Sequence, residues 1–251
     1  MIMPFSGWVF LKTCKMANPW FRFKQFLVRQ EKSAFKVGTD GVLLGAWADT
    51  DGVNTVLDIG TGTGLLALML AQRTKAKIMA IEIDRASYQQ ASENIKNSPW
   101  TDRINVQHCS IQDFSSEGKF DLIITNPPFF QDSLRPEEEG RSKSRHNTML
   151  SLDELAGSAI RHMHGESKFS LVLPVEESSD FEHIASGVGL FLHRILHIRP
   201  TPAHPVKRHL MEYRLYPTKK VHSEELIVEK GERHDYTPEY RNLTKEFYLK
   251  Y

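Results

Sequence analysis

The 251-residue sequence is poor in cysteine, in long apolar runs and in net charge. Its two cysteines, Cys14 and Cys109, are too few for a disulfide framework or a cysteine-based zinc site, and they fit a reducing compartment such as the cytoplasm. No apolar run reaches about 18 residues, so no membrane-spanning helix is expected. A basic region before the first apolar patch is also missing, so no signal peptide is expected.

The composition is typical of a globular protein, with 40% hydrophobic and 25% charged residues. At roughly 150 residues per domain, the length predicts one large domain. Met16 offers an alternative start. We therefore expect residues 1–15 to be a disordered lead and residues 16–251 to form a single domain, with a monomer favoured.

The formal net charge of +1 conceals two basic segments. Residues 1–39 contain seven Lys and Arg against one acidic residue, and residues 199–220 contain six against one. Such clustering favours a local surface for a polyanion. The alternative is two solvated surfaces that never meet in space.

Apolar periodicity predicts alternating strands and helices. Strands are expected over residues 55–60, 77–84, 104–108, 120–125, 169–174, 191–198 and 211–216. Helices are expected over residues 65–73, 85–97, 152–162 and 176–186. This order predicts an α/β fold with a doubly wound, mostly parallel seven-stranded sheet. The hairpin-like last pair of strands predicts one antiparallel strand at an edge.

A glycine-rich turn follows the first predicted strand, in the sequence from Asp58 through Gly60, Gly62 and Gly64. Glycines let the backbone approach a ligand, and the next helix begins there. The dinucleotide fingerprint needs its third glycine one residue later, which disfavours a nicotinamide oxidoreductase. The turn resembles motif I of the class I S-adenosylmethionine methyltransferases, of Rossmann-like fold, and this implies that the turn holds the amino-acid end of that cofactor.

Acidic residues follow the next two strands. Glu82 comes 22 positions after Gly60, where a carboxylate can accept both hydrogen bonds of a ribose diol. Asp84 is the neighbouring candidate, and Ile83 could pack on the adenine ring. Asp113 stands where the methyltransferases use an acid to bind the adenine amino group. The alternative is that these carboxylates cap helices or turns.

The sequence Asn126-Pro127-Pro128-Phe129 follows the fourth predicted strand. It resembles the (N/D)-P-P-(Y/F/W) motif of methyltransferases that act on planar nitrogens. The Asn126 side-chain oxygen and the Pro127 carbonyl can accept the two hydrogens of a conjugated amine, whose lone pair then localises. The prolines fix φ and remove competing N–H donors. Phe129 offers a face on which the target base can stack.

Three further segments narrow the resemblance to one family. They span residues 35–47, residues 145–155 and residues 236–251. They look like those of the bacterial tRNA1(Val) (adenine-N(6))-methyltransferases, which modify the adenine directly 3′ of the anticodon. The resemblance covers residues 17–251 and implies a cytoplasmic enzyme that uses S-adenosyl-L-methionine and tRNA, with Thr39 and Asp40 over the cofactor pocket.

Several basic side chains are candidates for contact with the RNA. They are Arg22, Lys24, Arg145, His146, Lys207 and Arg208. About 120 residues follow the Asn-Pro-Pro-Phe motif, which leaves no room for the large recognition region of DNA adenine methyltransferases. Recognition of a folded RNA requires a smaller protein region, because a base in a loop is easily unstacked. No metal site is expected.

Other functions stay open at this point. A methyltransferase for the guanine-N(2) of ribosomal RNA or for a protein glutamine would use the same motif. A protein of another class, an RNA-binding module that kept the fold and lost the chemistry, would bind the cofactor without transferring its methyl group.

Overall fold

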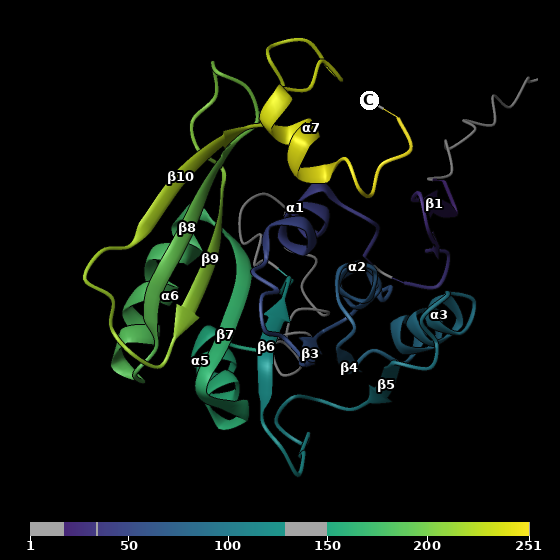
Figure 1. Cartoon of the computed structure of the whole chain (residues 1–251), viewed down its shortest axis with the longest axis vertical. Coiled ribbons are helices and arrows are strands. Elements are labelled where there is room, and N and C mark those ends of the chain that lie inside the picture. The colour runs from purple at the N-terminus through teal and green to yellow at the C-terminus, as the bar shows by residue number, and fades with distance from the viewer. Residues whose placement is uncertain (1–17, 34, 129–149, 251) are drawn as a thin grey trace, which may run out of the picture.

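An eight-stranded, mostly parallel sheet forms the centre of the molecule, and helices cover both of its faces (Figure 1). The computed structural model describes residues 18–33, 35–128 and 150–250. The predicted disordered lead lies outside these residues. The strand order is β10-β8-β9-β7-β6-β3-β4-β5. The strands are β3 (Thr55–Ile59), β4 (Lys77–Glu82), β5 (Ile104–His108), β6 (Phe120–Thr125), β7 (Met163–Pro174), β8 (Phe191–Arg199), β9 (Arg208–Arg214) and β10 (His222–Ile227).

Two hydrophobic cores lie on opposite faces of this sheet. Along β3, Val56 points into one core, whereas Leu57 and Ile59 point into the other, as the alternation of a strand requires. The first core is covered by α1 (Thr39–Trp47), α2 (Leu65–Arg73), α3 (Arg85–Lys96) and α7 (Pro238–Thr244). The second is covered by α5 (Leu152–His162) and α6 (Val175–Gly187). Burial on both faces explains why the central strands are nearly continuous apolar runs.

The predicted α/β fold is confirmed, but the sheet has eight strands rather than seven. All seven expected strands are present, and β10 is the additional one. It pairs in parallel with β8 and forms an edge of the sheet. Its first four residues are exposed and polar. An edge strand of this kind carries no apolar pattern, which is why periodicity does not reveal it.

The predicted position of the antiparallel strand is wrong. β9 is antiparallel, as expected, but it lies between β7 and β8 rather than at an edge. The physical reason is burial: the residues from Leu210 to Tyr213 are fully buried, so both faces of β9 need cover. In contrast, most of β8 is only partly buried. The more deeply buried strand of the hairpin therefore lies next to β7, and β8 is covered at its outer side by β10.

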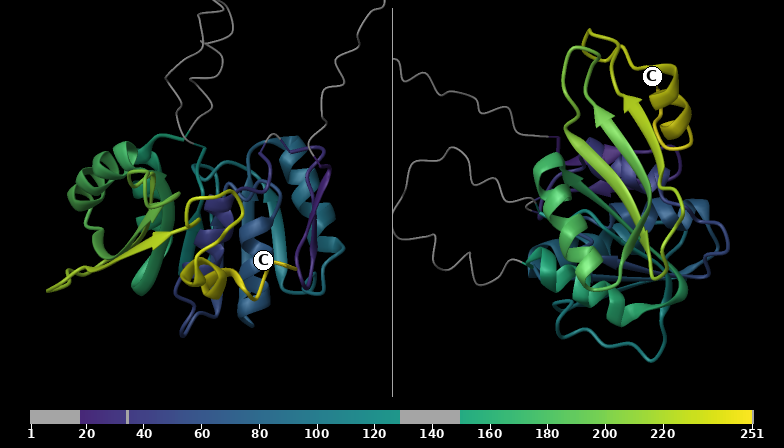
Figure 2. Two further views of the ribbon diagram at one scale, coloured as in Figure 1. Left: turned by 90° about the horizontal axis from the view of Figure 1, so that it is seen from above. Right: turned by 90° about the vertical axis from the view of Figure 1, so that its left-hand side faces the viewer.

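The two ends of the described chain pack together on the face of α1 and α2. A short hairpin, β1 (Trp20–Arg22) and β2 (Leu27–Arg29), lies beside the C-terminal segment. The Lys24 N–H donates to the Phe247 carbonyl at 2.8 Å. Phe23 stacks on Tyr248, with ring centroids 6.0 Å apart. Figure 2 shows α7 beside the end of β10, so the C-terminal segment connects the edge of the sheet to the hairpin.

Candidate active site

The carboxyl ends of three adjacent strands bring the two motif turns together. β3 pairs with β6 on one side and β4 on the other. Ile59 is in register with both Thr125 and Ile81. The residues that follow Ile59 and Thr125, Gly60 and Asn126, therefore leave the sheet at the same level. After β3 the chain forms β4 and β5 on one side of β3 and then crosses to the other side to form β6. This reversal is the position at which open α/β sheets bind ligands.

The glycine turn adopts a backbone that other residues rarely adopt. Gly60 and Gly62 have φ values of 67° and 59°, in the left-handed region that glycine enters without strain. A Cβ built on either would meet nothing within 4 Å, so open space lies beside the backbone. Gly64 differs, because its Cβ would lie 3.6 Å from Ala91 of α3. The first two glycines therefore border open space, whereas Gly64 lies against α3 and is favoured by its φ of 83°.

Glu82 is held against the glycine turn. It is 8% exposed, and one carboxylate oxygen accepts from the Gly62 N–H at 2.8 Å while the other accepts from the Asp84 N–H at 2.9 Å. Asp84 itself caps α3 by accepting from the Ser87 N–H at 2.7 Å. The neighbouring Ile83 is 54% exposed, which is unusual for a large apolar side chain. Asp84 therefore caps α3, whereas Glu82 faces the glycine turn and Ile83 faces solvent.

Asp58 is fully buried beneath the same turn. Its Oδ2 accepts from the Thr61 hydroxyl at 2.5 Å and from the Ala67 N–H at 3.1 Å. Burial raises the pKa of this carboxyl to about 7, and the nearby charge of Glu82 acts in the same direction. Its Oδ1 has no hydrogen-bond partner among the described residues. Asp58 thus ties the turn to α2 and retains an unused acceptor.

Asn126 shows the same feature at the end of the neighbouring strand, β6. Its side-chain oxygen is buried without a hydrogen-bond partner in the described part of the chain. A Cβ built on Gly41 of α1 would lie 3.5 Å from the Asn126 amide nitrogen, so only a small residue fits beside it. Pro127 is half-buried and Pro128 is exposed. Phe129 lies outside the described residues.

The start of α1 forms the third side of the site. Thr39 is its first residue, and Asp40 lies in its first turn, where a carboxylate is favoured by the helix dipole. The Asp40 Oδ2 accepts from the Arg208 Nε at 2.9 Å. Two residues predicted for different partners, the cofactor and the RNA, therefore form one ion pair next to Asn126.

The remaining predicted positions are more scattered. Asp113 is exposed beyond β5, and its Oδ2 accepts from the Ser110 hydroxyl at 2.7 Å. Arg22 and Lys24 are exposed on the N-terminal hairpin, where the Lys24 ammonium donates to the Lys245 carbonyl. Arg145 and His146 lie outside the described residues.

The two basic segments of the sequence do meet in space, but only in part. Phe21 beside Arg22 and Lys207 line the same pocket at the carboxyl edge. β9 then carries the second segment away, because Arg208 and Arg214 lie at its two ends. Arg214 pairs with Glu212 at 3.0 Å. The basic residues beyond it therefore lie toward the opposite edge.

Sequence reasoning missed several elements of this site. It did not assign α1 as a helix, although this helix begins at Thr39 and its Gly41 lies beside Asn126. The continuous apolar run from Val42 to Trp47 was the available signal.

Among the described residues, no group of three or more His, Cys, Asp or Glu side chains could hold a metal ion. None of the described helices has the length and apolar character of a transmembrane segment.

The strand order, the glycine turn and the Asn-Pro-Pro turn together define a class I S-adenosylmethionine-dependent methyltransferase. The chain is 47% identical to a tRNA1(Val) (adenine(37)-N6)-methyltransferase from Phocaeicola vulgatus, over 93% of this chain and 99% of that protein. It is 44% identical to a protein of the same name from Trichodesmium erythraeum, over 94% of this chain and all of that one. The chain therefore belongs to the tRNA1(Val) (adenine(37)-N6)-methyltransferase family.

Two further comparisons agree with the fold. The family model for the methyltransferase small domain matches residues 35–138, which include the glycine turn and Asn126. The solved structure of a predicted O-methyltransferase from Agrobacterium tumefaciens superimposes with a TM-score of 0.65 and 18% identity. That superposition covers 83% of this chain and 96% of the other. At this identity the likeness concerns the fold alone.

Proposed function

We propose that this protein transfers the methyl group of S-adenosyl-L-methionine to the N6 amine of adenine 37 in tRNA1(Val). The observation that carries the proposal is the buried side-chain oxygen of Asn126, which has no partner among the described residues and lies one strand away from the glycine turn. An unpaired buried acceptor costs free energy, so it is retained where a ligand supplies the donor. The relatives that share nearly the whole chain carry this activity in their name.

The residues around the glycine turn fit the cofactor. The open space beside Gly60 and Gly62 admits a ligand to the backbone, and the unused Oδ1 of Asp58 would accept from its ammonium group. Glu82 would hold the ribose hydroxyls with the carboxylate that now accepts from the Gly62 N–H. Ile83 would cover the adenine ring. Asp113 would accept from its amino group, after release of Ser110.

The opposite side of the crevice would orient the target amine. The Asn126 oxygen and the Pro127 carbonyl would each accept one N6 hydrogen, which concentrates the nitrogen lone pair toward the methyl group. Pro128 limits the backbone of the turn, and Phe129 would stack on the target base. The cofactor supplies an activated methyl group when bound. The protein's own contribution is therefore mostly positioning for in-line transfer.

The start of α1 would connect the two ligands. Thr39 and Asp40 would lie over the cofactor, with Asp40 fixed by Arg208. Arg22, Lys24 and Lys207 would contact RNA phosphates. Arg145 and His146 would do so from the segment after the Asn-Pro-Pro-Phe motif. We further propose that residues 16–251 act as one domain, as a monomer, in the cytoplasm where tRNA is modified.

A labelled-methyl assay tests the proposal. Total tRNA, ribosomal RNA and a release factor are offered separately with tritiated cofactor, which separates tRNA methylation from guanine and glutamine methylation. A tRNA1(Val) transcript with adenine at position 37 is then compared with one that carries guanine there. We expect label in tRNA alone, in the adenine transcript alone, and as N6-methyladenosine by mass spectrometry. Binding of the cofactor without transfer to any RNA would instead indicate a catalytically silent RNA-binding module.

A further inference from the structure

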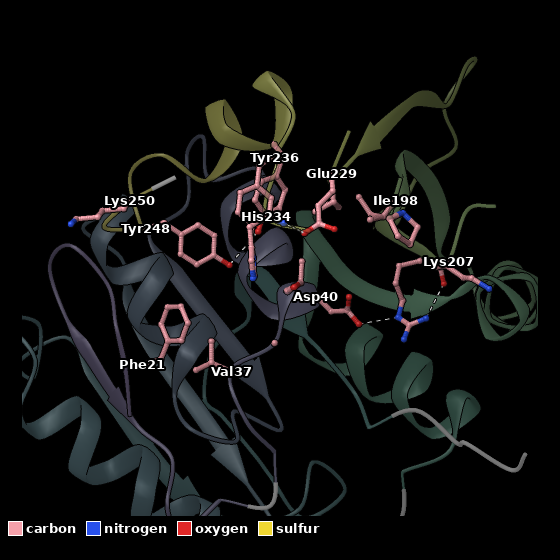
Figure 3. Close-up of a pocket in the computed structure, with 16 residues that line it drawn as sticks. Phe21, Val37, Asp40, Ile198, Lys207, Glu229, His234, Tyr236, Tyr248 and Lys250 are labelled. Atoms are coloured by element: carbon pink, nitrogen blue, oxygen red, sulfur yellow. Dashed lines mark hydrogen bonds and ion pairs between the residues drawn. The ribbon is translucent and has the colours of Figure 1, made fainter. Parts of the chain in front are cut away.

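A pocket of about 770 Å³ lies beside the candidate active site, at the carboxyl ends of the parallel strands (Figure 3). The N-terminal hairpin, the start of α1, the loops after β8 and β10 and the C-terminal segment surround it. Thr39 and Asp40 line this pocket, and a Cβ built on the next residue, Gly41, would lie 3.5 Å from the Asn126 amide nitrogen. The first turn of α1 therefore lies between this pocket and Asn126.

Aromatic rings form one side of the pocket. Tyr236 and Tyr240 stack with centroids 4.8 Å apart at 22°, and Tyr240 and Tyr248 stack at 6.3 Å and 29°. Phe21 lies edge-on to Tyr248 at 6.0 Å. Phe21, Tyr236 and Tyr248 are half-buried in the pocket lining, so part of each ring remains accessible. Side chains from both ends of the chain thus build one aromatic surface.

The charged groups of the lining leave an excess of positive charge. Lys207 and Lys250 are exposed at opposite ends of the pocket (Figure 3). Neither ammonium forms a hydrogen bond or ion pair with another residue of the described chain. The acidic groups already have donors, because Asp40 accepts from Arg208 at 2.9 Å and Glu229 accepts from the His234 N–H at 2.8 Å.

His234 is fixed over the pocket by an unusual backbone. Its φ is 70°, the only positive value at a non-glycine residue among those described. Left-handed backbone at such a residue is uncommon and is held in place by its surroundings. The loop is closed by the Lys230 N–H to Asp235 carbonyl bond at 2.8 Å, and the His234 ring lies within 3.1 Å of the Tyr236 hydroxyl.

We propose that this pocket binds an RNA nucleotide adjacent to the target adenine, an inference that rests on the proposed function. Moving the target base into the Asn126 crevice removes its neighbour's stacking partner. The aromatic side of the pocket, with His234, replaces that partner, and Lys207 and Lys250 contact the flanking phosphates. Stacking on aromatic rings beside a basic groove is how proteins hold unpaired nucleotides.

Two variants test this without disturbing the crevice. His234→Gly removes the imidazole and suits the left-handed backbone, and the pair Lys207→Ala/Lys250→Ala removes the two exposed charges. Lys219→Ala/Lys220→Ala is the matched control, because it removes the same charge beyond the other end of β9. Thermal unfolding verifies that each variant folds.

Fluorescence anisotropy measures binding of an anticodon stem-loop with S-adenosylhomocysteine present, so that no transfer occurs. We expect the His234 variant and the Lys207/Lys250 variant each to bind about tenfold more weakly, and the control pair within about twofold of the parent. Cofactor affinity should not change in any of them. Parent-like binding by both pocket variants overturns the proposal.

Two further stem-loops, each with an abasic nucleotide on one side of the target adenine, test whether the pocket binds the base of that neighbouring nucleotide. On one of the two sides, the missing base should weaken binding to the parent about tenfold but add nothing to the loss in His234→Gly. If the two losses multiply, or if neither abasic position matters to the parent, the pocket does not hold that base. A parent that binds the stem-loop without methylating it contradicts the proposed function, and the binding comparison then judges the pocket separately.

Discussion

Substitution of Asn126 tests the proposed chemistry of the site more directly than substitution of any other residue named here. Its side-chain oxygen makes no hydrogen bond within the described chain, so its loss removes little from the fold. We expect Asn126→Ala to raise the barrier to methyl transfer by about 2–4 kcal/mol, as loss of a preorganised hydrogen-bonding group does. Cofactor affinity should barely change. Single-turnover kinetics and calorimetric titration measure the two quantities.

Asn126→Asp is the control for this substitution, because a carboxylate oxygen at the same position also accepts hydrogen bonds. It should retain most of the rate. If the alanine variant methylates tRNA as fast as the parent, Asn126 does not orient the amine.

Gly62 tests the cofactor side of the crevice. Gly62→Ala places a Cβ in the open space beside the turn and forces alanine into left-handed backbone, which costs about 1–2 kcal/mol. We expect cofactor affinity to fall at least about tenfold, as measured by calorimetry. Gly189→Ala is the matched control. Its φ is 86° and its Cβ also meets nothing within 4 Å, but it lies between α6 and β8.

Both glycine variants should lose similar stability, and only Gly62→Ala should lose affinity. Equal cofactor binding by the two variants would contradict the assignment of the glycine turn.

At the residue scale, motif spacing predicted that Gly62, Glu82 and Asn126 lie at strand ends, because local sequence dictates a tight turn after a buried strand. Spacing could not show that Arg208 pairs with Asp40, since the two residues are 168 positions apart. It also could not show that Asp58 is fully buried, because burial depends on what packs above the turn.

At the scale of elements, β9 joins β8 and α6 through a pair of histidines. The rings of His197 and His209 lie edge to face, 4.7 Å apart, and the Ser178 hydroxyl of α6 lies 2.7 Å from His209 Nδ1. Burial, together with the nearby charge of His197, lowers the pKa of His209 to about 4. Folding therefore favours the neutral imidazole.

This pKa shift predicts acid sensitivity. Because the unfolded histidine gains its proton near pH 6.5, stability falls as the pH drops from there toward 4. After allowance for solvent screening, we expect a loss on the order of 1 kcal/mol across that window. Urea unfolding at several pH values should give a smaller loss for His209→Asn, whose amide can still donate to Ser178. Parallel pH curves for parent and variant would contradict the shift.

Periodicity predicted the elements that have a polar and an apolar face, or that lie in the middle of the sheet. It missed α1, because residues 41–47 are all buried and a helix covered on all sides shows no amphipathic pattern. It missed β1 and β2 because they contain only three residues each. α7 was missed for a similar reason, since it is one short helix after Pro238.

At the scale of the whole molecule, the C-terminal segment holds the N-terminal hairpin in place. Phe247 is 2% exposed and belongs to the core beneath α1 and α2. We expect Phe247→Ala to lower the free energy of unfolding by about 3–5 kcal/mol, because it leaves a cavity in that core. Chemical denaturation measures this loss.

Leu249→Ala is the matched control, because Leu249 is 54% exposed and lies two residues further along. Its effect should stay within about 0.5 kcal/mol. A loss of that same small size in the Phe247 variant would show that the segment contributes little to the fold.

Strand and helix alternation was sufficient to predict the doubly wound architecture, but not the place of β9 within the sheet. That place follows from which strand of a hairpin buries more surface, and this is a property of the assembled molecule. The meeting of Phe21 with Lys207 at one pocket is likewise a long-range result of the packed ends.

In the proposed reaction the glycine turn holds the cofactor and Asn126 holds the target amine, so the two ligands must meet between β3 and β6. The most direct measurement is a crystal structure of the protein with an unreactive cofactor analogue and a tRNA1(Val) anticodon stem-loop. We expect adenine 37 beside Asn126, with its N6 hydrogen-bonded to Asn126 and Pro127 and roughly 3–3.5 Å from the position of the donor methyl. An adenine bound elsewhere, or separated from the donor by more than about twice that distance, would contradict it.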